Sequence, residues 1–175
     1  MNNLNTRPDG GSLEVTVGGL SRYDLIAALN SQQIQLNTHA QILLDDAVFG
    51  DTSKQHVISV VERSVCDLGL PNGGTLEQVF DVAQMHGLKL CPPTAGPYLR
   101  LAMTNQESST DVVMSRGHAP EGSYTVAAPT LSDEDEYPKG FYLRAVNGQL
   151  WLRGYRCDDL HRWSPDDQFI FQLHP

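Results

Sequence analysis

The chain has 175 residues and a mass of 19.3 kDa, which suits one domain with a core large enough to fold without disulfides or a metal. Hydrophobic residues make up 40% of it and charged residues 19%, values that exclude wholesale disorder and fibrous folds. The formal net charge of −9 argues against binding to duplex nucleic acid or to an anionic membrane, because both require an excess of Lys and Arg.

The cysteines and the apolar runs predict a cytoplasmic protein. Cys66, Cys91 and Cys157 are odd in number and widely spaced, with no CxxC pair, which fits a reduced, intracellular setting. Residues 1–11 are polar and lack the apolar core of a secretory signal. The apolar run at residues 57–61 is too short to cross a bilayer.

The first part of the chain predicts a strand, two helices and a buried strand. Residues 12–17 alternate apolar and polar side chains, as a short strand does. Ser21 is placed to cap a helix that runs to Leu29. Apolar residues at helical spacing predict a second helix over 38–49, and the β-branched segment 56–66 predicts a strand buried on both faces. The joint between the two helices is too long for a DNA-binding helix-turn-helix.

The central part predicts the best-defined helix. Thr75 and Gln78 have the spacing of a capping box, an apolar stripe follows, and Gly87 ends the helix. Residues 67–74 before it form a loop, and residues 88–91 after it form a short strand.

After Pro97 the pattern predicts strands and turns. Asn147-Gly148 is a strong signal for a two-residue hairpin turn between strands at 141–146 and 149–155. The other predicted elements are strands at 98–103, 111–114, 124–128 and 168–173, and an acidic loop at 132–138. We therefore predict a single α+β domain over 1–175, with a helical part at 1–50 and a core at 55–175. In it, the N-terminal helices and the 75–86 helix pack on a mostly antiparallel, curved sheet formed by the C-terminal half, residues 97–173.

Three segments carry a resemblance to a group of small bacterial proteins. They are Asp67-Leu-Gly-Leu-Pro-Asn-Gly-Gly-Thr75, Gly87-Leu-Lys-Leu-Cys-Pro92 and Leu99-Arg-Leu101, followed by a hairpin with Trp151 and a closing strand after Trp163. The resemblance covers about residues 20–173 and implies a bacterial or mobile-element origin, with no activity attached. Some members carry the label helicase, but this chain has no GxxxxGK[ST] phosphate loop and is too short for a helicase core.

The hairpin supplies the candidate binding residues. A two-residue turn pairs Tyr142 with Arg153 and Arg144 with Trp151, so these side chains and Tyr155 share one face of the strands. Alternating aromatic and guanidinium groups are typical of binding surfaces. A cross-strand ladder covered by other parts of the chain is the alternative interpretation. Arg100 is a further candidate binding residue, which would join this surface from a neighbouring strand.

The remaining chemistry predicts no catalytic residue, metal or cofactor. Cys157 and His161 have zinc-like spacing without a second ligand pair, and the carboxylates beside Cys157 disfavour a reactive thiolate. Residues 133–136 lack the spacing of a calcium loop, and neither a GxSxG elbow nor a GxGxxG dinucleotide motif occurs. Gly73-Gly74 before the central helix is weak support for an anion site, because Thr75 already caps that helix.

We therefore expect a non-catalytic binding protein, such as an inhibitor, immunity or regulatory module. Its partner would be a protein or a small anionic ligand that contacts the Arg/aromatic face of the hairpin. The alternative is a small hydrolase or transferase with a site assembled from residues distant in sequence. A cleft holding two or more ionisable groups with strongly shifted pKa values would favour the enzyme.

Overall fold

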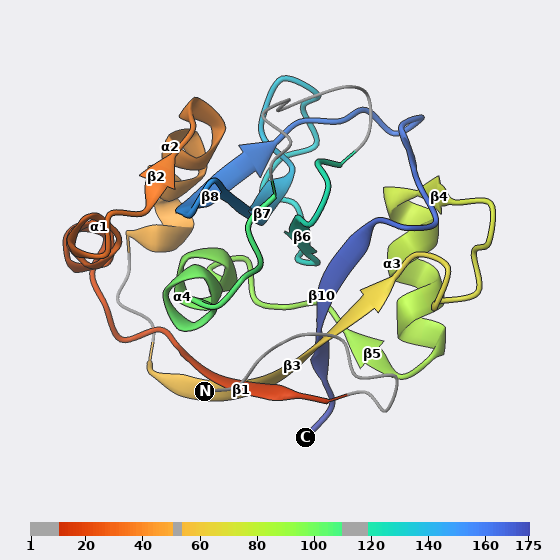
Figure 1. Ribbon diagram of the computed structural model, residues 1–175, viewed down its shortest axis with the longest axis horizontal. Coiled ribbons are helices and arrows are strands. Elements are labelled where there is room, and N and C mark those ends of the chain that lie inside the picture. The colour runs from red at the N-terminus through yellow and green to blue at the C-terminus, as the bar shows by residue number, and fades with distance from the viewer. Residues whose placement is uncertain (1–10, 51–53, 110–118) are drawn as a thin grey trace.

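A computed structural model describes residues 11–50, 54–109 and 119–175 and has the predicted α+β class (Figure 1). The helices are α1 (Arg22–Ser31), α2 (Thr38–Leu44), a 3-10 turn (Ala47–Phe49), α3 (Leu76–Met85) and α4 (Ala95–Ala102). The strands are β1 (Leu13–Val17), β2 (Gln35–Leu36), β3 (His56–Ser64), β4 (Gly74–Thr75), β5 (Leu88–Lys89), β6 (Tyr124–Val126), β7 (Gly140–Val146), β8 (Gln149–Tyr155), β9 (Arg162–Trp163) and β10 (Gln168–Leu173).

Eight strands form one curled, mostly antiparallel sheet. Its order is β1-β3-β10-β6-β7-β8-β2, with β5 paired beside β10, while β4 and β9 form a separate two-stranded ladder. Two pairs are parallel, β10 with β6 and β2 with β8. The sheet therefore also includes strands from the N-terminal half of the chain, whereas the sequence analysis drew it from residues 97–173.

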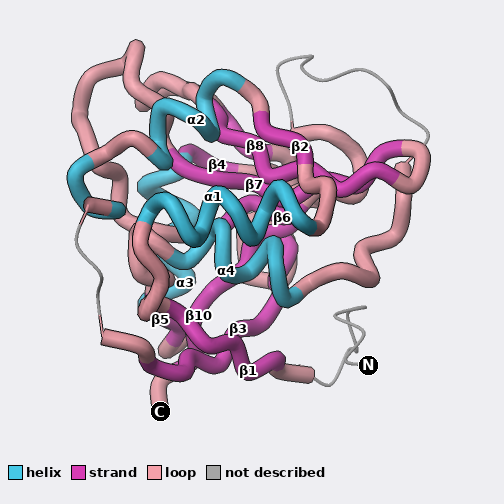
Figure 2. Tube along the Cα trace, turned by 90° about the vertical axis from the view of Figure 1, so that its left-hand side faces the viewer, coloured by secondary structure: helices cyan, strands magenta, loops and turns pink. Residues whose placement is uncertain are grey.

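Helix α4 lies inside the curl of the sheet. It contacts β1 near one end of the sheet and β7 and β8 near the other, and α1 packs beside it (Figures 1 and 2). The first hydrophobic core surrounds α4; its members include Val15, Leu25, Leu29, Leu43, Val60, Leu99, Leu143, Leu152 and Ile170.

Helix α3 covers the opposite face of β3 and β10. The second core lies there, with Val61, Val65, Val79, Ala83, Trp163, Phe169 and Phe171 among its members. In Figure 1, α3 stands on the far side of β10 from α4. Because both faces of the sheet are covered, the central strands are buried on both sides, as the β-branched sequence of β3 predicts.

The structure confirms four local predictions made from the sequence. Ser21 accepts a hydrogen bond from Asp24 N and caps α1. Thr75 and Gln78 form the complete capping box of α3. Asn147 and Gly148 take left-handed backbone conformations, with φ of 49° and 80°, as a two-residue hairpin turn requires. The hairpin register is also confirmed, since Arg144 pairs with Trp151.

Two predictions are wrong. Residues 98–103 form most of helix α4 instead of a strand, because every residue from 95 to 100 is buried and the helix shows no polar face in its sequence. Cys66 is exposed in the turn after β3, where the sequence analysis placed it in the apolar strand. The predicted 38–49 helix is split into α2 and the 3-10 turn. The strand predicted at 111–114 lies outside the described residues.

Gly154 allows α2 to begin directly against β8. A Cβ atom at this position would lie 2.6 Å from the backbone carbon of His39 and 2.8 Å from Ala40 N. The Asn37 side chain joins the two elements: its amide donates to Gly154 O at 3.0 Å, and its oxygen accepts from Gly154 N at 2.8 Å and from Ala40 N at 2.9 Å. One asparagine therefore both caps α2 and extends the edge of β8.

We expect Gly154→Ala to lower the free energy of unfolding by about 1–3 kcal/mol, because the methyl group meets backbone atoms that have no rotamer in which to move away. Urea unfolding followed by circular dichroism measures the change. Glu14→Ala, at an exposed position of β1, is the control. Equal stability of the two variants would contradict the close approach of α2 and β8.

Candidate functional site

The predicted Arg/aromatic face is not a continuous exposed surface. Arg144 is fully buried and Tyr142 is 6% exposed, so the β7 half of the face is covered. On β8, Trp151, Arg153 and Tyr155 are half-buried. The structure therefore keeps the predicted pairing of these residues but leaves only the β8 half accessible.

Tyr155 belongs to the second core. Its ring lies edge-on to the buried Trp163, with 5.4 Å between the ring centroids. Burial raises the pKa of its hydroxyl group above the ordinary value. Tyr155 consequently has a structural role and leaves the candidate binding surface.

Arg100 lies in the first core and comes from α4, whereas the sequence analysis assigned it to a strand. Its Nη1 donates to Gln106 Oε1 at 2.6 Å and to the carbonyl oxygens of Arg144 and Trp151 at 3.3 Å each. Its Nη2 donates to Met103 O, and Nε has no partner. Burial lowers the pKa of this guanidinium to about 10. Arg100 therefore ties α4 to the hairpin and is not available to a ligand.

We expect Arg100→Ala to lower the free energy of unfolding by more than about 2 kcal/mol, because it leaves several buried acceptors without their donor. Arg100→Lys keeps the charge but offers one nitrogen in place of the guanidinium fork, so it should recover less than half of the loss. Urea unfolding of both variants tests this. A fully stable lysine variant would show that charge alone matters.

Arg153 is the arginine of the Arg/aromatic face that remains accessible. Its Nε donates to the hydroxyl oxygen of Tyr142 at 2.6 Å, and its guanidinium carbon lies 5.1 Å from the centroid of the Trp151 ring and 5.8 Å from that of Tyr142. Its two Nη groups have no hydrogen-bond partner among the described residues, and no described carboxylate lies within ion-pair distance. The arginine is thus held in one orientation with its outer donors unused.

His39 lies within electrostatic reach of both Arg153 and Arg156. His39, at the start of α2, has a buried Nδ1 atom without a hydrogen-bond partner. Its pKa is lowered first by burial and then by the charges of Arg156 and Arg153. Arg156 forms an exposed ion pair with Glu136 at 2.6 Å. We call the set Tyr142, Trp151, Arg153, His39 and Arg156 the Arg153 site.

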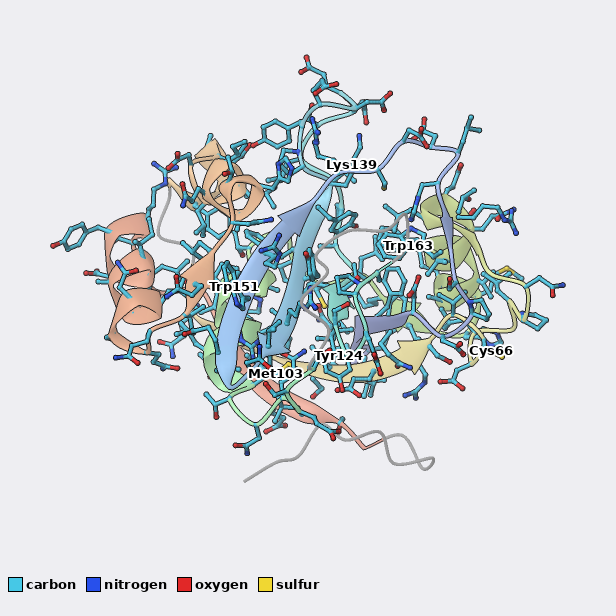
Figure 3. All side chains as sticks on the ribbon, turned by 45° about the horizontal axis from the view of Figure 1, so that its top comes forward. Cys66, Met103, Tyr124, Lys139, Trp151 and Trp163 are labelled. Atoms are coloured by element: carbon cyan, nitrogen blue, oxygen red, sulfur yellow. The ribbon has the colours of Figure 1, made fainter. Side chains whose placement is uncertain are left out.

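His39 could not be recognised as a site residue from the sequence, where it is one of several histidines that are scattered singly along the chain. No local signal marks it, because 114 positions separate it from Arg153. The parallel pairing of β2 with β8, Gln35 opposite Trp151, and the Asn37 link bring the start of α2 to the end of β8. Figure 3 shows Trp151 on β8, on the side of the molecule that carries α1 and α2.

Glu62 is a buried carboxyl on the concave face of β3. It is 5% exposed, and neither oxygen has a hydrogen-bond partner. Burial raises its pKa from 4.5 to about 7. Glu62 on β3 pairs with Ile170 on β10. Gln168 lies two residues before Ile170, on the same face of β10, and pairs with Tyr124 on β6. The Gln168 Oε1 atom is also buried without a partner, and burial together with the charge of Glu62 raises the Tyr124 pKa to about 12.

Because the folded-state pKa of Glu62 is above its ordinary value, the folded state holds the proton more tightly. The stability of the protein should therefore fall as the pH rises from about 4.5 to 7, with the loss complete above 7 and amounting to about 3 kcal/mol at most.

We expect Glu62→Gln to remove this dependence. Between pH 5.5 and pH 8 the variant should gain about 2 kcal/mol of unfolding free energy relative to the parent chain. Urea unfolding at four pH values measures it, and parallel stability curves would refute the buried, ionisable Glu62. Glu14→Gln is the control, because Glu14 is exposed.

Burial disfavours the reactive thiolate form of two cysteines, and no metal-binding group is found among the described residues. Burial raises the pKa of Cys91 to about 12 and that of Cys157 to about 11; for Cys157, Asp158 and Asp159 add to the effect. Within ranges 11–50, 54–109 and 119–175, no group of three or more His, Cys, Asp or Glu residues is arranged to hold a metal ion. In the same ranges no helix is both long and apolar enough to span a bilayer.

Comparison with known proteins gives no further assignment: no family model, curated protein or solved structure matches the chain. The resemblance carried by residues 67–101 and the hairpin stays a prediction.

Proposed function

We propose that this chain is a non-catalytic binding protein, of the inhibitor, immunity or regulatory kind, that recognises an anionic group through the Arg153 site. The anionic group is a carboxylate or phosphate, on a protein partner or on a small ligand. The observation that carries the proposal is Arg153 itself, in a protein of net charge −9: a stacked guanidinium whose two Nη groups have no hydrogen-bond partner among the residues that the structure describes.

The physical argument rests on orientation. Tyr142 and Trp151 hold the Arg153 side chain in place, so little conformational entropy remains to be lost when it binds an oxyanion through both Nη groups. No ion pair with a described carboxylate offsets the charge of Arg153, while the acidic remainder of the surface repels anions. An anion is therefore attracted to this place in preference to others.

An enzyme is the second candidate, and Glu62 is the observation in its favour. A carboxyl group with a pKa near 7 has the value that a general acid or base needs. However, Glu62 is 5% exposed, and it lines neither the groove of about 330 Å³ beside Gln168 nor the groove of about 650 Å³ beside α3. Because Glu62 is buried whereas Arg153 is accessible, binding is the better supported function.

Titration with inorganic phosphate or succinate tests the Arg153 site. We expect a change in tryptophan fluorescence, which reports on Trp151 because it is half-buried, whereas Trp163 is 5% exposed. Arg153→Ala should abolish the change and weaken anion binding at least tenfold, about the 1.5–3 kcal/mol of a hydrogen bond to a charged group. Its effect on unfolding should stay below about 1 kcal/mol.

Arg162→Ala is the matched control, since Arg162 is exposed on β9 and its loss changes the net charge equally. If both variants weaken anion binding to the same extent, the attraction is diffuse and the Arg153 site is not its origin. If Arg153→Ala instead lowers stability by several kcal/mol, the arginine is a structural link between β7 and β8.

A further inference from the structure

A groove of about 650 Å³ runs along α3. Its other walls are the loop between β6 and β7 and the segment that follows β8. It is lined by Leu76, Glu77, Phe80, Asp81, Gln84, Leu90, Pro129, Thr130, Asp133, Lys139, Cys157, Asp158 and Asp159. We call it the α3 groove.

The lining of the α3 groove includes an apolar set that the second core holds in place. Phe80 lies edge-on to the buried Phe169, with 6.4 Å between the ring centroids. Leu76, Leu90 and Cys157 pack against the same core and are partly buried. These side chains present a preformed apolar surface, so a ligand pays little to order it.

Five carboxylates also line the groove. Glu77 and Asp81 come from α3, Asp133 from the loop before β7, and Asp158 and Asp159 from the segment after β8. None of these five carboxylates forms an ion pair, since the described residues contain one, between Arg156 and Glu136. The groove carboxylates are therefore not neutralised by ion pairs with other described residues.

The cation in this lining does not neutralise these carboxylates directly. Lys139 is 7% exposed, and its Nζ donates to the carbonyl oxygens of Ser132, at 3.4 Å, and Glu134, at 3.2 Å. Its ammonium group is bound to the backbone of the acidic loop and shapes that wall (Figure 3). Five carboxylates and one such ammonium leave the lining formally at −4.

Two large apolar side chains stand exposed next to groove residues in the chain. Met85 follows Gln84 at the end of α3, and Leu160 follows Asp159; each is 84% exposed. Exposed apolar side chains beside a groove are typical of protein-binding surfaces.

We propose that the α3 groove docks a basic peptide segment of a protein partner, one that carries Arg or Lys together with apolar side chains. The carboxylates on opposite walls match the basic side chains, and Phe80 with its apolar neighbours matches the others. A second copy of this chain is disfavoured by its own charge of −9, and no described group of three His, Cys, Asp or Glu would hold a bare metal ion. The proposal is independent of the Arg153 site.

The probe for this proposal is a fluorescein-labelled octapeptide of alternating arginine and leucine, measured by fluorescence anisotropy at fixed ionic strength. We expect saturable binding, weaker by several fold when glycine replaces leucine, and none when glutamate replaces arginine. Asp81→Asn with Asp159→Asn should weaken binding about tenfold, because two exposed charge contacts each contribute a factor of about 2–5. Both residues are exposed, and neither side chain forms a hydrogen bond with another residue in the described part of the chain, so folding should be unchanged.

Glu14→Gln with Glu107→Gln is the matched control, since these exposed acids lie outside the groove and the change in net charge is the same. Its peptide affinity should change by less than twofold. Equal weakening by both pairs would overturn the proposal, because it would show diffuse attraction to an acidic protein. Absence of binding, or equal binding of the leucine and glycine peptides, would also overturn it.

The alkylation rates of two cysteines in the same chain report where the peptide binds. Cys157 lines the groove, whereas Cys66 is exposed elsewhere in the turn after β3. The peptide should slow the alkylation of Cys157 by iodoacetamide and leave that of Cys66 unchanged; equal rates at Cys157 with and without peptide would overturn the placement. Sedimentation of the protein alone tests the other occupant: dimers lost in the Asp81→Asn, Asp159→Asn variant would assign the groove to a second copy and overturn the peptide proposal.

Discussion

The rest of this structure depends on the hydrogen bonds that the buried guanidinium group of Arg100 donates. A charged group inside a hydrophobic core is costly unless its hydrogen-bonding positions are filled. Here they are filled by Gln106 and by backbone carbonyls of the β7–β8 hairpin and of the end of α4, with Nε the exception. Since these acceptors come from separate elements, the arginine is satisfied only when α4 lies inside the curled sheet. The sheet and the helix specify each other.

The position of α4 determines the accessible chemistry of the hairpin. The concave face of the hairpin packs against α4 and is buried in the first core, through residues such as Leu143 and Leu152. On the other face, Arg144 is covered, while Arg153 stays accessible beside the start of α2. Of the two arginines on this face, only Arg153 is therefore accessible, and it is held in one orientation. A single oriented arginine is better suited to binding one anionic group than an extended acidic surface.

The two proposed surfaces are joined by the end of β8. Arg153 and Arg156 belong to the Arg153 site, and Cys157, Asp158 and Asp159, directly after them, line the α3 groove. Positive and negative surfaces thus follow one another within seven residues of chain. The end of β8 and the residues directly after it therefore contribute to both proposed surfaces.

Sequence by itself determined what depends on near neighbours: the caps at Ser21 and Thr75, the turn at Asn147-Gly148 and the register of the hairpin. Each follows from hydrogen bonds and dihedral angles within a few residues, which the chain carries wherever it folds. Tertiary structure decided that residues 95–102 form a helix, because a helix buried on all sides has no polar stripe to reveal its period. It also decided which arginine is accessible and that His39 lies beside it. Covering a side chain requires contacts between distant segments, and these are set by packing and not by local spacing.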